Sequence, residues 1–105
     1  MQNILSLLEI AKSSAVKAGN FLKRSFYSTQ ETLFNEGREI KLKIDNDSEE
    51  IILKSITSQS NLPILSEESG ILGNLSNKFW VVDPLDGSSN YFRKIPICAV
   101  SVALI

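Results

Sequence analysis

Hydrophobic residues recur every three or four positions between residues 3 and 26. This spacing places apolar side chains on one face of a helix and therefore predicts a long amphipathic helix over 3–26. The expected apolar stripe is Ile4, Leu8, Ala11, Ala15, Ala18 and Leu22, joined by Leu5, Leu7, Phe21 and Phe26. A helix on a membrane surface is an alternative, but the polar face is not strongly basic, which favours packing against a core.

The pattern then changes from helix to strand and back to helix. Apolar residues alternate with lysines over 39–44, which predicts a half-buried strand. Asp47, followed three residues later by Glu50, is the pattern of a capping box, so a second helix is expected over 46–58. The polar segment 28–38 before them is predicted to be a turn or a hairpin connection.

Three shorter apolar segments predict strands over 63–66, 79–82 and 96–105. Two glycines and two asparagines predict a loop over 70–78. Alternating helices and strands indicate the α/β class, a layered α+β sandwich. Because the last apolar strand ends at Ile105 without a turn or polar tail, we expect the chain to be the N-terminal part of a longer fold.

Composition excludes several kinds of chemistry. The 105 residues contain no histidine, which excludes Ser-His-Asp and Cys-His catalysis and histidine-ligated zinc. The one cysteine, Cys98, cannot form an internal disulfide, which fits a reducing compartment. No segment reaches the roughly 18–20 apolar residues that span a bilayer, and no signal peptide is recognisable. A small cytoplasmic protein without a membrane or nucleic-acid partner is expected.

Charge is distributed unevenly along the chain. Residues 1–44 contain seven Lys or Arg against four Asp or Glu, whereas residues 45–86 contain eight Asp or Glu against two lysines. An acidic middle segment of this kind is suited to holding cations.

Acidic side chains follow the predicted strands at three places: Asp45, the pair Glu67 and Glu68, and Asp83 with Asp86. Loops at strand ends are where α/β proteins keep functional groups, and oxygen ligands without histidine or cysteine favour Mg²⁺. Each place also has a structural explanation. Asp-Pro and Asp-Gly are common in turns, Glu67 and Glu68 form an ordinary solvated pair, and Asp45 is suited to capping a helix.

Taken together, the acidic segments resemble a known family. Asp83-Pro84-Leu85-Asp86-Gly87-Ser88-Ser89-Asn90-Tyr91 is similar to the D-P-[IL]-D-G-[TS]-x-N-[FY] signature of the inositol monophosphatase family. Ser66-Glu67-Glu68-Ser69 resembles its E-E-S segment, and Asp45 matches the aspartate before its second helix. The resemblance implies the N-terminal portion of the αβαβα fold shared by inositol monophosphatases and fructose bisphosphatases.

The resemblance also implies site residues and a cofactor. Glu67, Asp83, the Leu85 carbonyl and Asp86 would bind Mg²⁺. Glu67 and Ser88 would activate and orient the attacking water, with Asp45 supporting the Ser88 hydroxyl. The backbone amides of Gly87 and Ser88 would bind phosphate. The implied reaction is hydrolysis of a small phosphate monoester.

Two departures from the family pattern leave alternatives open. The family usually has a threonine shortly before the aspartate matched by Asp45, where this chain has Leu42 and Lys43. The chain is also much shorter than a full member, so a further metal-binding aspartate and the substrate-selecting residues would lie beyond Ile105. An inactive remnant or interaction module is therefore the alternative to an enzyme. Inositol phosphate, fructose 1,6-bisphosphate and 3′(2′)-phosphoadenosine nucleotides are the substrate alternatives, and the full-length form is expected to be a homodimer.

Overall fold

The computed structural model describes residues 3–36, 39–74 and 76–105. Its helices and strands are α1 (Ile4–Ser25), β1 (Thr32–Glu36), β2 (Glu39–Leu42), α2 (Lys43–Thr57), β3 (Ile64–Ser66), β4 (Gly70–Leu72), β5 (Trp80–Asp86), α3 (Ser88–Phe92) and β6 (Ala99–Leu104). The predicted mixture of helices and sheet is confirmed.

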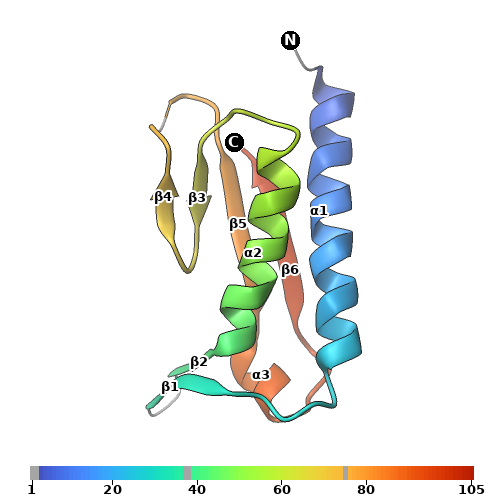
Figure 1. Ribbon diagram of the computed structural model, residues 1–105, viewed down its shortest axis with the longest axis vertical. Helices are drawn as coiled ribbons and strands as arrows, with labels where there is room; N and C mark the ends of the chain where they lie inside the picture. The colour runs from blue at the N-terminus through green and yellow to red at the C-terminus, as the bar shows by residue number, and fades with distance from the viewer. Residues whose placement is uncertain (1–2, 37–38, 75) are drawn as a thin grey trace.

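The main sheet has the strand order β4-β3-β5-β6. Strands β3 and β5 are parallel, whereas β4 pairs with β3 and β6 pairs with β5 in antiparallel fashion. Helices α1 and α2 lie side by side on one face of this sheet (Figure 1). The hairpin of β1 and β2 forms a separate small sheet beside α3, at the end of the molecule opposite the two chain termini.

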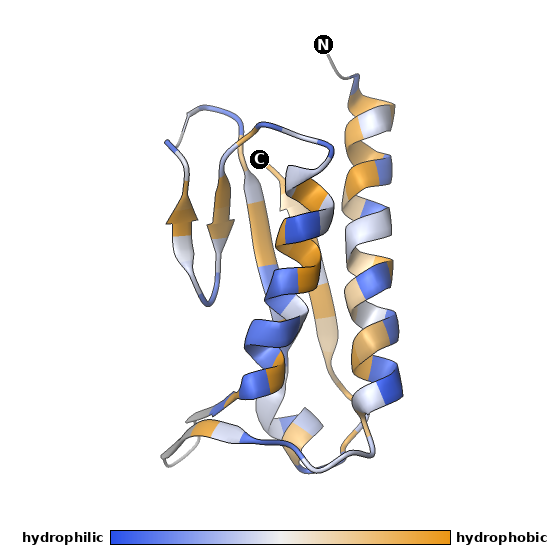
Figure 2. Ribbon diagram, viewed as in Figure 1, coloured by the Kyte–Doolittle hydropathy of each residue, from blue (hydrophilic) through white to orange (hydrophobic). Residues whose placement is uncertain are grey.

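Two hydrophobic clusters hold the helices to the sheet. The first joins α1 and α2 to β3 and β5, and its largest member is Trp80, which is fully buried and donates from its indole nitrogen to the Ser60 hydroxyl at 3.1 Å. The second surrounds Leu85 and Tyr91 near the end of β5. Figure 2 shows the corresponding apolar bands along the strands and on parts of both helices. The end of β5 is therefore anchored in a core.

Helix α1 buries a face that matches the predicted one only in part, since Leu7, Ala18 and Leu22 are buried as predicted. The buried residues are Leu7, Ile10, Ser14, Ala18 and Leu22, whereas the predicted stripe members Ile4 and Leu8 are 74% and 51% exposed. The neighbouring helix explains the change, because the Ser14 hydroxyl donates to the Ser55 hydroxyl of α2 at 2.8 Å. The apolar residues of α1 are too widely distributed around it for periodicity alone to select this face.

The boundary between β2 and α2 also differs from the prediction. The strand ends at Leu42 rather than at residue 44, and the helix begins at Lys43 rather than at residue 46. Asp45 caps the helix by accepting a hydrogen bond from the Leu42 backbone N–H at 2.8 Å. The predicted capping box of Asp47 and Glu50 is wrong, because Asp47 pairs with Lys43, one turn before it, and Glu50 pairs with Lys54, one turn after it.

The later strands are shifted or added relative to the prediction. β5 continues to Asp86 instead of ending at residue 82, and β6 begins at Ala99 instead of at residue 96. The segment before β6 is held against α3, since the Asn90 side-chain amide donates to the Ile97 carbonyl at 2.9 Å. The segments 28–38 and 70–78, predicted as connections, contain the short strands β1 and β4. Strand β1 pairs with β2, and β4 pairs with β3. In the described part of the chain, no helix is long and apolar enough to cross a membrane.

Tyr91 is expected to make folding stability fall at high pH. Its side chain is 1% exposed, and its hydroxyl donates to the Leu22 carbonyl at 2.8 Å. Burial, together with the Cys98 thiolate, raises the pKa of Tyr91 to about 12. The native state therefore favours the protonated phenol, so this stability is full below the unfolded-state pKa of about 10 and is lost as the pH rises towards 12.

Urea unfolding of the wild type and Tyr91→Phe at pH 9 and pH 11 tests this prediction. At pH 9, the free energy of unfolding of the variant should be about 1 kcal/mol lower than that of the wild type, because one buried hydrogen bond is removed. Between pH 9 and pH 11, the free energy of unfolding should fall less in the variant than in the wild type. An equal loss in both proteins would show that Tyr91 does not contribute to the high-pH transition.

Candidate metal and phosphate site

Strand β5 brings the acidic motif to one end of the main sheet. Its pairing with β6 shifts register between Asp83 and Asp86. Pro84 lies inside this shift, where its missing N–H interrupts no regular ladder. The Pro84 carbonyl accepts a hydrogen bond at 2.7 Å from the buried Ser48 hydroxyl of α2. The irregular part of β5 is thus tied to α2, with a carboxylate on each side of it.

Gly87 turns the chain from β5 into α3. Its φ of 95° lies in the left-handed region, which side chains other than glycine adopt at a cost. A Cβ atom here would lie 2.9 Å from the Ile97 carbonyl oxygen. The turn directs the Ser88 hydroxyl back towards α2, 2.8 Å from Asp45 Oδ1 and 3.3 Å from the Leu85 carbonyl oxygen.

Asp45 is the most deeply buried carboxylate of the site, with 1% of its surface exposed. One carboxylate oxygen accepts from the Leu42 N–H and the other from the Ser88 hydroxyl. Burial raises the pKa of Asp45 above its usual value, while these hydrogen bonds and the Lys41 ammonium counteract part of the increase. Asp45 therefore has both predicted associations: it caps α2 and it contacts Ser88.

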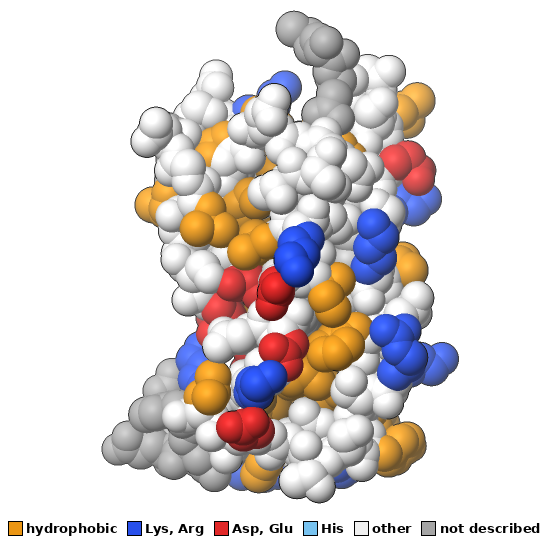
Figure 3. All heavy atoms as spheres, viewed as in Figure 1, with side chains coloured by type: hydrophobic (Ala, Val, Ile, Leu, Met, Phe, Trp, Pro, Cys, Tyr) orange, Lys and Arg blue, Asp and Glu red, His pale blue; other side chains and the backbone are white. Residues whose placement is uncertain are grey.

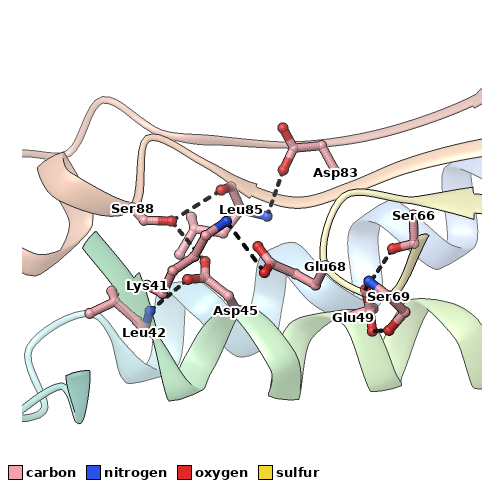
Figure 4. Close-up of polar contacts among 10 residues, drawn as sticks. All are labelled: Lys41, Leu42, Asp45, Glu49, Ser66, Glu68, Ser69, Asp83, Leu85 and Ser88. Atoms are coloured by element: carbon pink, nitrogen blue, oxygen red, sulfur yellow. Dashed lines mark hydrogen bonds and ion pairs between the residues drawn. The ribbon is translucent and has the colours of Figure 1, made fainter. Parts of the chain in front are cut away.

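The turn after β3 supplies the second acidic segment. The Glu67 backbone N–H donates to the Val82 carbonyl of β5 at 2.9 Å, while the Glu67 side chain is exposed. The Glu68 side chain is directed between α2 and β5 (Figure 4) and forms a 3.6 Å ion pair with Lys41. Burial raises the pKa of Glu68, although Lys41 opposes the shift and the Asp45 carboxylate adds to it.

Asp83 lies in a field of like charge. Burial raises the pKa of its carboxyl group, the Leu85 N–H partly opposes this, and the carboxylates of Glu67, Asp86 and Asp45 raise it further. Four predicted site carboxylates are therefore near enough to interact. Among the described residues, however, no group of three or more carboxylate or thiol side chains is arranged closely enough to hold a metal ion. The donor chemistry fits Mg²⁺, which prefers oxygen ligands and neutralises such a field.

The space-filling view shows several acidic side chains on this face of the molecule, with lysines beside them (Figure 3). Some of them lie at an indentation of the outline, between the part formed by β3 and β4 and the lower part of the molecule. A separate cavity of about 560 Å³ lies between α1 and the start of β6 and is mostly apolar. None of the predicted site residues lines that cavity.

Three contact residues of the site were missed by sequence reasoning: Ser48, Glu49 and Lys41. Ser48 and Glu49 lie on the buried face of α2, which continues to Ile52 and Ile56. Their signal in the sequence is that this apolar stripe, extended backwards by one turn, meets polar residues. A polar residue at a core position needs a buried partner.

Removal of the Ser88 hydroxyl is expected to destabilise the chain and to raise the pKa of Asp45 further. Ser88→Ala should cost about 1–2 kcal/mol in free energy of unfolding, because Asp45 loses a hydrogen bond to its charged form. Urea unfolding and a carboxyl ¹³C NMR titration of Asp45 measure the two effects. Ser89→Ala is the matched control, since the Ser89 hydroxyl contacts only the exposed Arg93 side chain among the contacts described. Equal behaviour of the two variants would contradict the role assigned to the Ser88–Asp45 contact.

Comparisons of sequence and of structure both find relatives of this chain among known proteins. A sequence model of the inositol monophosphatase family matches residues 3–105. The fructose-1,6-bisphosphatase/inositol-1-monophosphatase of Aquifex aeolicus (strain VF5) is 36% identical over 100% of this chain, which covers 41% of that protein. Nus factor SuhB of Escherichia coli (strain K12) is 33% identical over 93% of the chain, which covers 38% of it.

Solved structures show where the chain lies in the family fold. The inositol monophosphatase from Anabaena (Nostoc) sp. PCC 7120 superposes with a TM-score of 0.79 at 32% identity. The superposition covers 99% of this chain and 36% of the Anabaena chain. The extragenic suppressor protein suhB from Bartonella henselae gives a TM-score of 0.84 at 30% identity, covering 93% and 40%. This chain thus spans about two fifths of these relatives and represents an N-terminal portion of their fold. It belongs to the inositol monophosphatase family.

Proposed function

We propose that this chain carries the first part of the active site of a Mg²⁺-dependent phosphate monoester hydrolase of the inositol-1-phosphatase type. The observation that carries the proposal is the meeting of α2 with the β5 motif. The Ser88 hydroxyl contacts both Asp45 and the Leu85 carbonyl, beside Asp83, whose pKa is raised by burial and by neighbouring carboxylates. A helix cap or a surface turn alone does not require this convergence of oxygen atoms.

Each residue has a distinct part in the proposed site. Glu67, Asp83, Asp86 and the Leu85 carbonyl would hold Mg²⁺, which when bound supplies positive charge to stabilise the phosphate and its leaving group. Ser88 donates its hydroxyl proton to Asp45. Its oxygen lone pairs are therefore available to accept a hydrogen bond from the attacking water, which Ser88 and Glu67 together would orient.

Phosphate binding completes the proposed arrangement. The backbone amides of Gly87 and Ser88 lie at the start of α3, beside the Asp45–Ser88 contact. Backbone N–H groups at such a turn are suited to donate hydrogen bonds to an anion. A small phosphorylated alcohol is the substrate class that this combination of amides and a magnesium site would bind.

Phosphate release tests the proposal. The chain is incubated with inositol 1-phosphate, and in parallel with fructose 1,6-bisphosphate, with Mg²⁺ or with EDTA. Release that requires Mg²⁺ and is absent from Asp83→Asn is the expected result. Release no faster than in that variant would contradict an active enzyme for this chain and favour the alternative, an inactive binding module of the same family.

The same proposal implies a cellular compartment and a class of binding partner. A small phosphorylated metabolite and Mg²⁺ are both available in the cytoplasm, where the single Cys98 would stay reduced. Among the relatives, one is named as a phosphatase and another as a Nus factor, so the family does not by itself decide between substrate and macromolecular partners. The absence of a nucleic-acid partner and the homodimeric full-length form remain predictions.

A further inference from the structure

The carboxylate of Glu49 accepts three hydrogen bonds from the end of β3 and the turn that follows it. Glu49 Oε2 accepts from the Ser66 hydroxyl at 2.6 Å and from the Ser69 backbone N–H at 3.0 Å. Glu49 Oε1 accepts from the Ser69 hydroxyl in a further short contact. Glu49 is 6% exposed, and Ser66 is 2% exposed. The contacts join residues 17 and 20 positions apart, so they connect α2 to the main sheet.

The two serines flank the proposed metal ligand. Glu67 follows Ser66, and its own N–H is bonded to Val82 of β5. Ser66 and Gly70, on either side of the turn, face each other across the β3–β4 pair. The Glu49 carboxylate reaches into this turn from α2 (Figure 4) and bonds to both serines around Glu67 and Glu68. The position of the acidic pair is therefore determined from two sides, by β5 and by α2.

Three donors facing one group require a particular side chain. A carboxylate accepts hydrogen bonds at both oxygens and donates none, whereas a glutamine has one acceptor oxygen and an NH₂ group that donates. The carboxylate nevertheless adds negative charge near Glu68, whose pKa it helps to raise. An acid at this place is thus electrostatically unfavourable for the site, and its contribution lies in the geometry that it imposes on the turn.

We propose that Glu49 is a positioning residue, which fixes the turn of residues 66–69 so that the Glu67 carboxylate is held at the end of β5 beside Asp83. The inference rests on the proposed metal site. It assigns Glu49 no contact with substrate or metal. With Ser48 bound to the Pro84 carbonyl and Asp45 bound to Ser88, Glu49 completes a row on α2 that holds both acidic segments.

The test compares Glu49→Gln with a matched control on the same helix. The control is Ser55→Ala, which removes the buried Ser14–Ser55 hydrogen bond away from the acidic segments. Two quantities are measured well below the unfolding midpoint: Mn²⁺ affinity by electron paramagnetic resonance, and hydrogen exchange of the Ser69 amide in the metal-free chain. We expect Glu49→Gln to weaken Mn²⁺ binding by about tenfold or more, as is typical when a residue that positions a metal ligand is lost.

The Ser69 amide should also exchange at least tenfold faster in Glu49→Gln than in the wild type. Ser55→Ala should leave both quantities within about twofold, even if it lowers the unfolding midpoint by the same amount. Equal changes in the two variants would overturn the proposal, because they would indicate a general loss of stability. Unchanged Mn²⁺ affinity and exchange in Glu49→Gln would overturn it as well.

A milder variant and the wild-type baseline keep the outcomes separate. If Glu49→Gln does not fold, Ser69→Ala removes one of the three contacts, and about threefold weaker Mn²⁺ binding supports the proposal while unchanged binding contradicts it. If the wild type binds no Mn²⁺, the proposed function fails. The exchange of the Ser69 amide then still decides whether Glu49 fixes the turn.

Discussion

Asp83→Asn is expected to raise the unfolding midpoint of the metal-free chain and to abolish its stabilisation by Mg²⁺. In the metal-free chain, Asp83 is partly buried among the carboxylates of Glu67, Asp86 and Asp45, which raise its pKa. The neutral asparagine removes that repulsion and retains an oxygen to accept the Leu85 N–H, now at 3.3 Å from Asp83 Oδ1. The same substitution removes a charged ligand from the proposed Mg²⁺ site.

The sizes of the two effects differ. A ligand at 100 times its dissociation constant stabilises the native state by about 2.7 kcal/mol. For a domain of this size, that corresponds to an increase in the unfolding midpoint of about 10 °C or more. Asp83→Asn should show almost none of this increase when Mg²⁺ is added. Differential scanning calorimetry in EDTA and in Mg²⁺ measures both effects on the same samples.

The pH dependence of the metal-free chain provides an independent check. Because the pKa of Asp83 is raised in the native state, the native state binds this proton more tightly than the unfolded state does. The corresponding stability is complete below the unfolded-state pKa of about 4 and is lost as the pH rises through the native pKa. Asp45 and Glu68 act in the same direction. In EDTA, the midpoint should therefore fall with rising pH, and less steeply in Asp83→Asn.

Asp47→Asn is the matched control for this prediction. Asp47 also lies in the acidic middle segment of the sequence, residues 45–86, but its side chain is 40% exposed and pairs with Lys43 on the surface of α2. Its removal should change the free energy of unfolding by less than about 0.5 kcal/mol, and it should leave the response to Mg²⁺ intact. If Mg²⁺ stabilises Asp83→Asn as strongly as the wild type, Asp83 is not a ligand.

Gly87→Ala is expected to destabilise the chain by about 2–5 kcal/mol. The left-handed backbone at Gly87 costs a side-chain-bearing residue about 1–2 kcal/mol, and forcing extra volume into a packed place costs about 1–3 kcal/mol more. The new Cβ atom would lie 2.9 Å from the Ile97 carbonyl oxygen and 3.3 Å from the Cys98 Cα atom. Because these are backbone atoms, the segment before β6 would have to move, and with it the Asn90 contact that holds it.

A second glycine in the chain gives a control of opposite sign. Gly19 lies within α1, and a Cβ atom there would meet nothing within 4 Å. Gly19→Ala should therefore stabilise the chain by about 0.5–1 kcal/mol, as expected for a helix interior. Urea unfolding compares the two variants. A shift of both midpoints in the same direction would mean that the conformation of Gly87 is not the constraint inferred here.

Sequence patterns were most informative where the signal is local. The apolar run before Asp83 predicted a buried strand, and the order of carboxylates, glycine and serine after it indicated the family that the comparisons confirm. The helical periods over the first and second helices were also correct in type. Such features depend on neighbours within a few residues, so they can be recognised along the chain without knowledge of the fold.

The tertiary structure decided the features that depend on distant partners. Whether Ile4 or Ile10 is buried depends on where α2 and β6 pack against α1. The helical period of the apolar residues alone allows either side chain to face the core. The packing of elements that are distant along the chain selects one of them.

The motif from Trp80 to Asn90 could thus be identified from the sequence, but the supporting contacts of Ser48 and Glu49 on α2 could not. The sequence by itself determined which oxygen-bearing side chains follow the buried strand and which family they belong to. Only the tertiary structure placed the Ser48 hydroxyl on the Pro84 carbonyl, 36 residues away, and Glu49 on the turn beside Glu67. The reason is physical: a buried polar group must find a partner, and which partner it finds depends on how the helix and the sheet pack together.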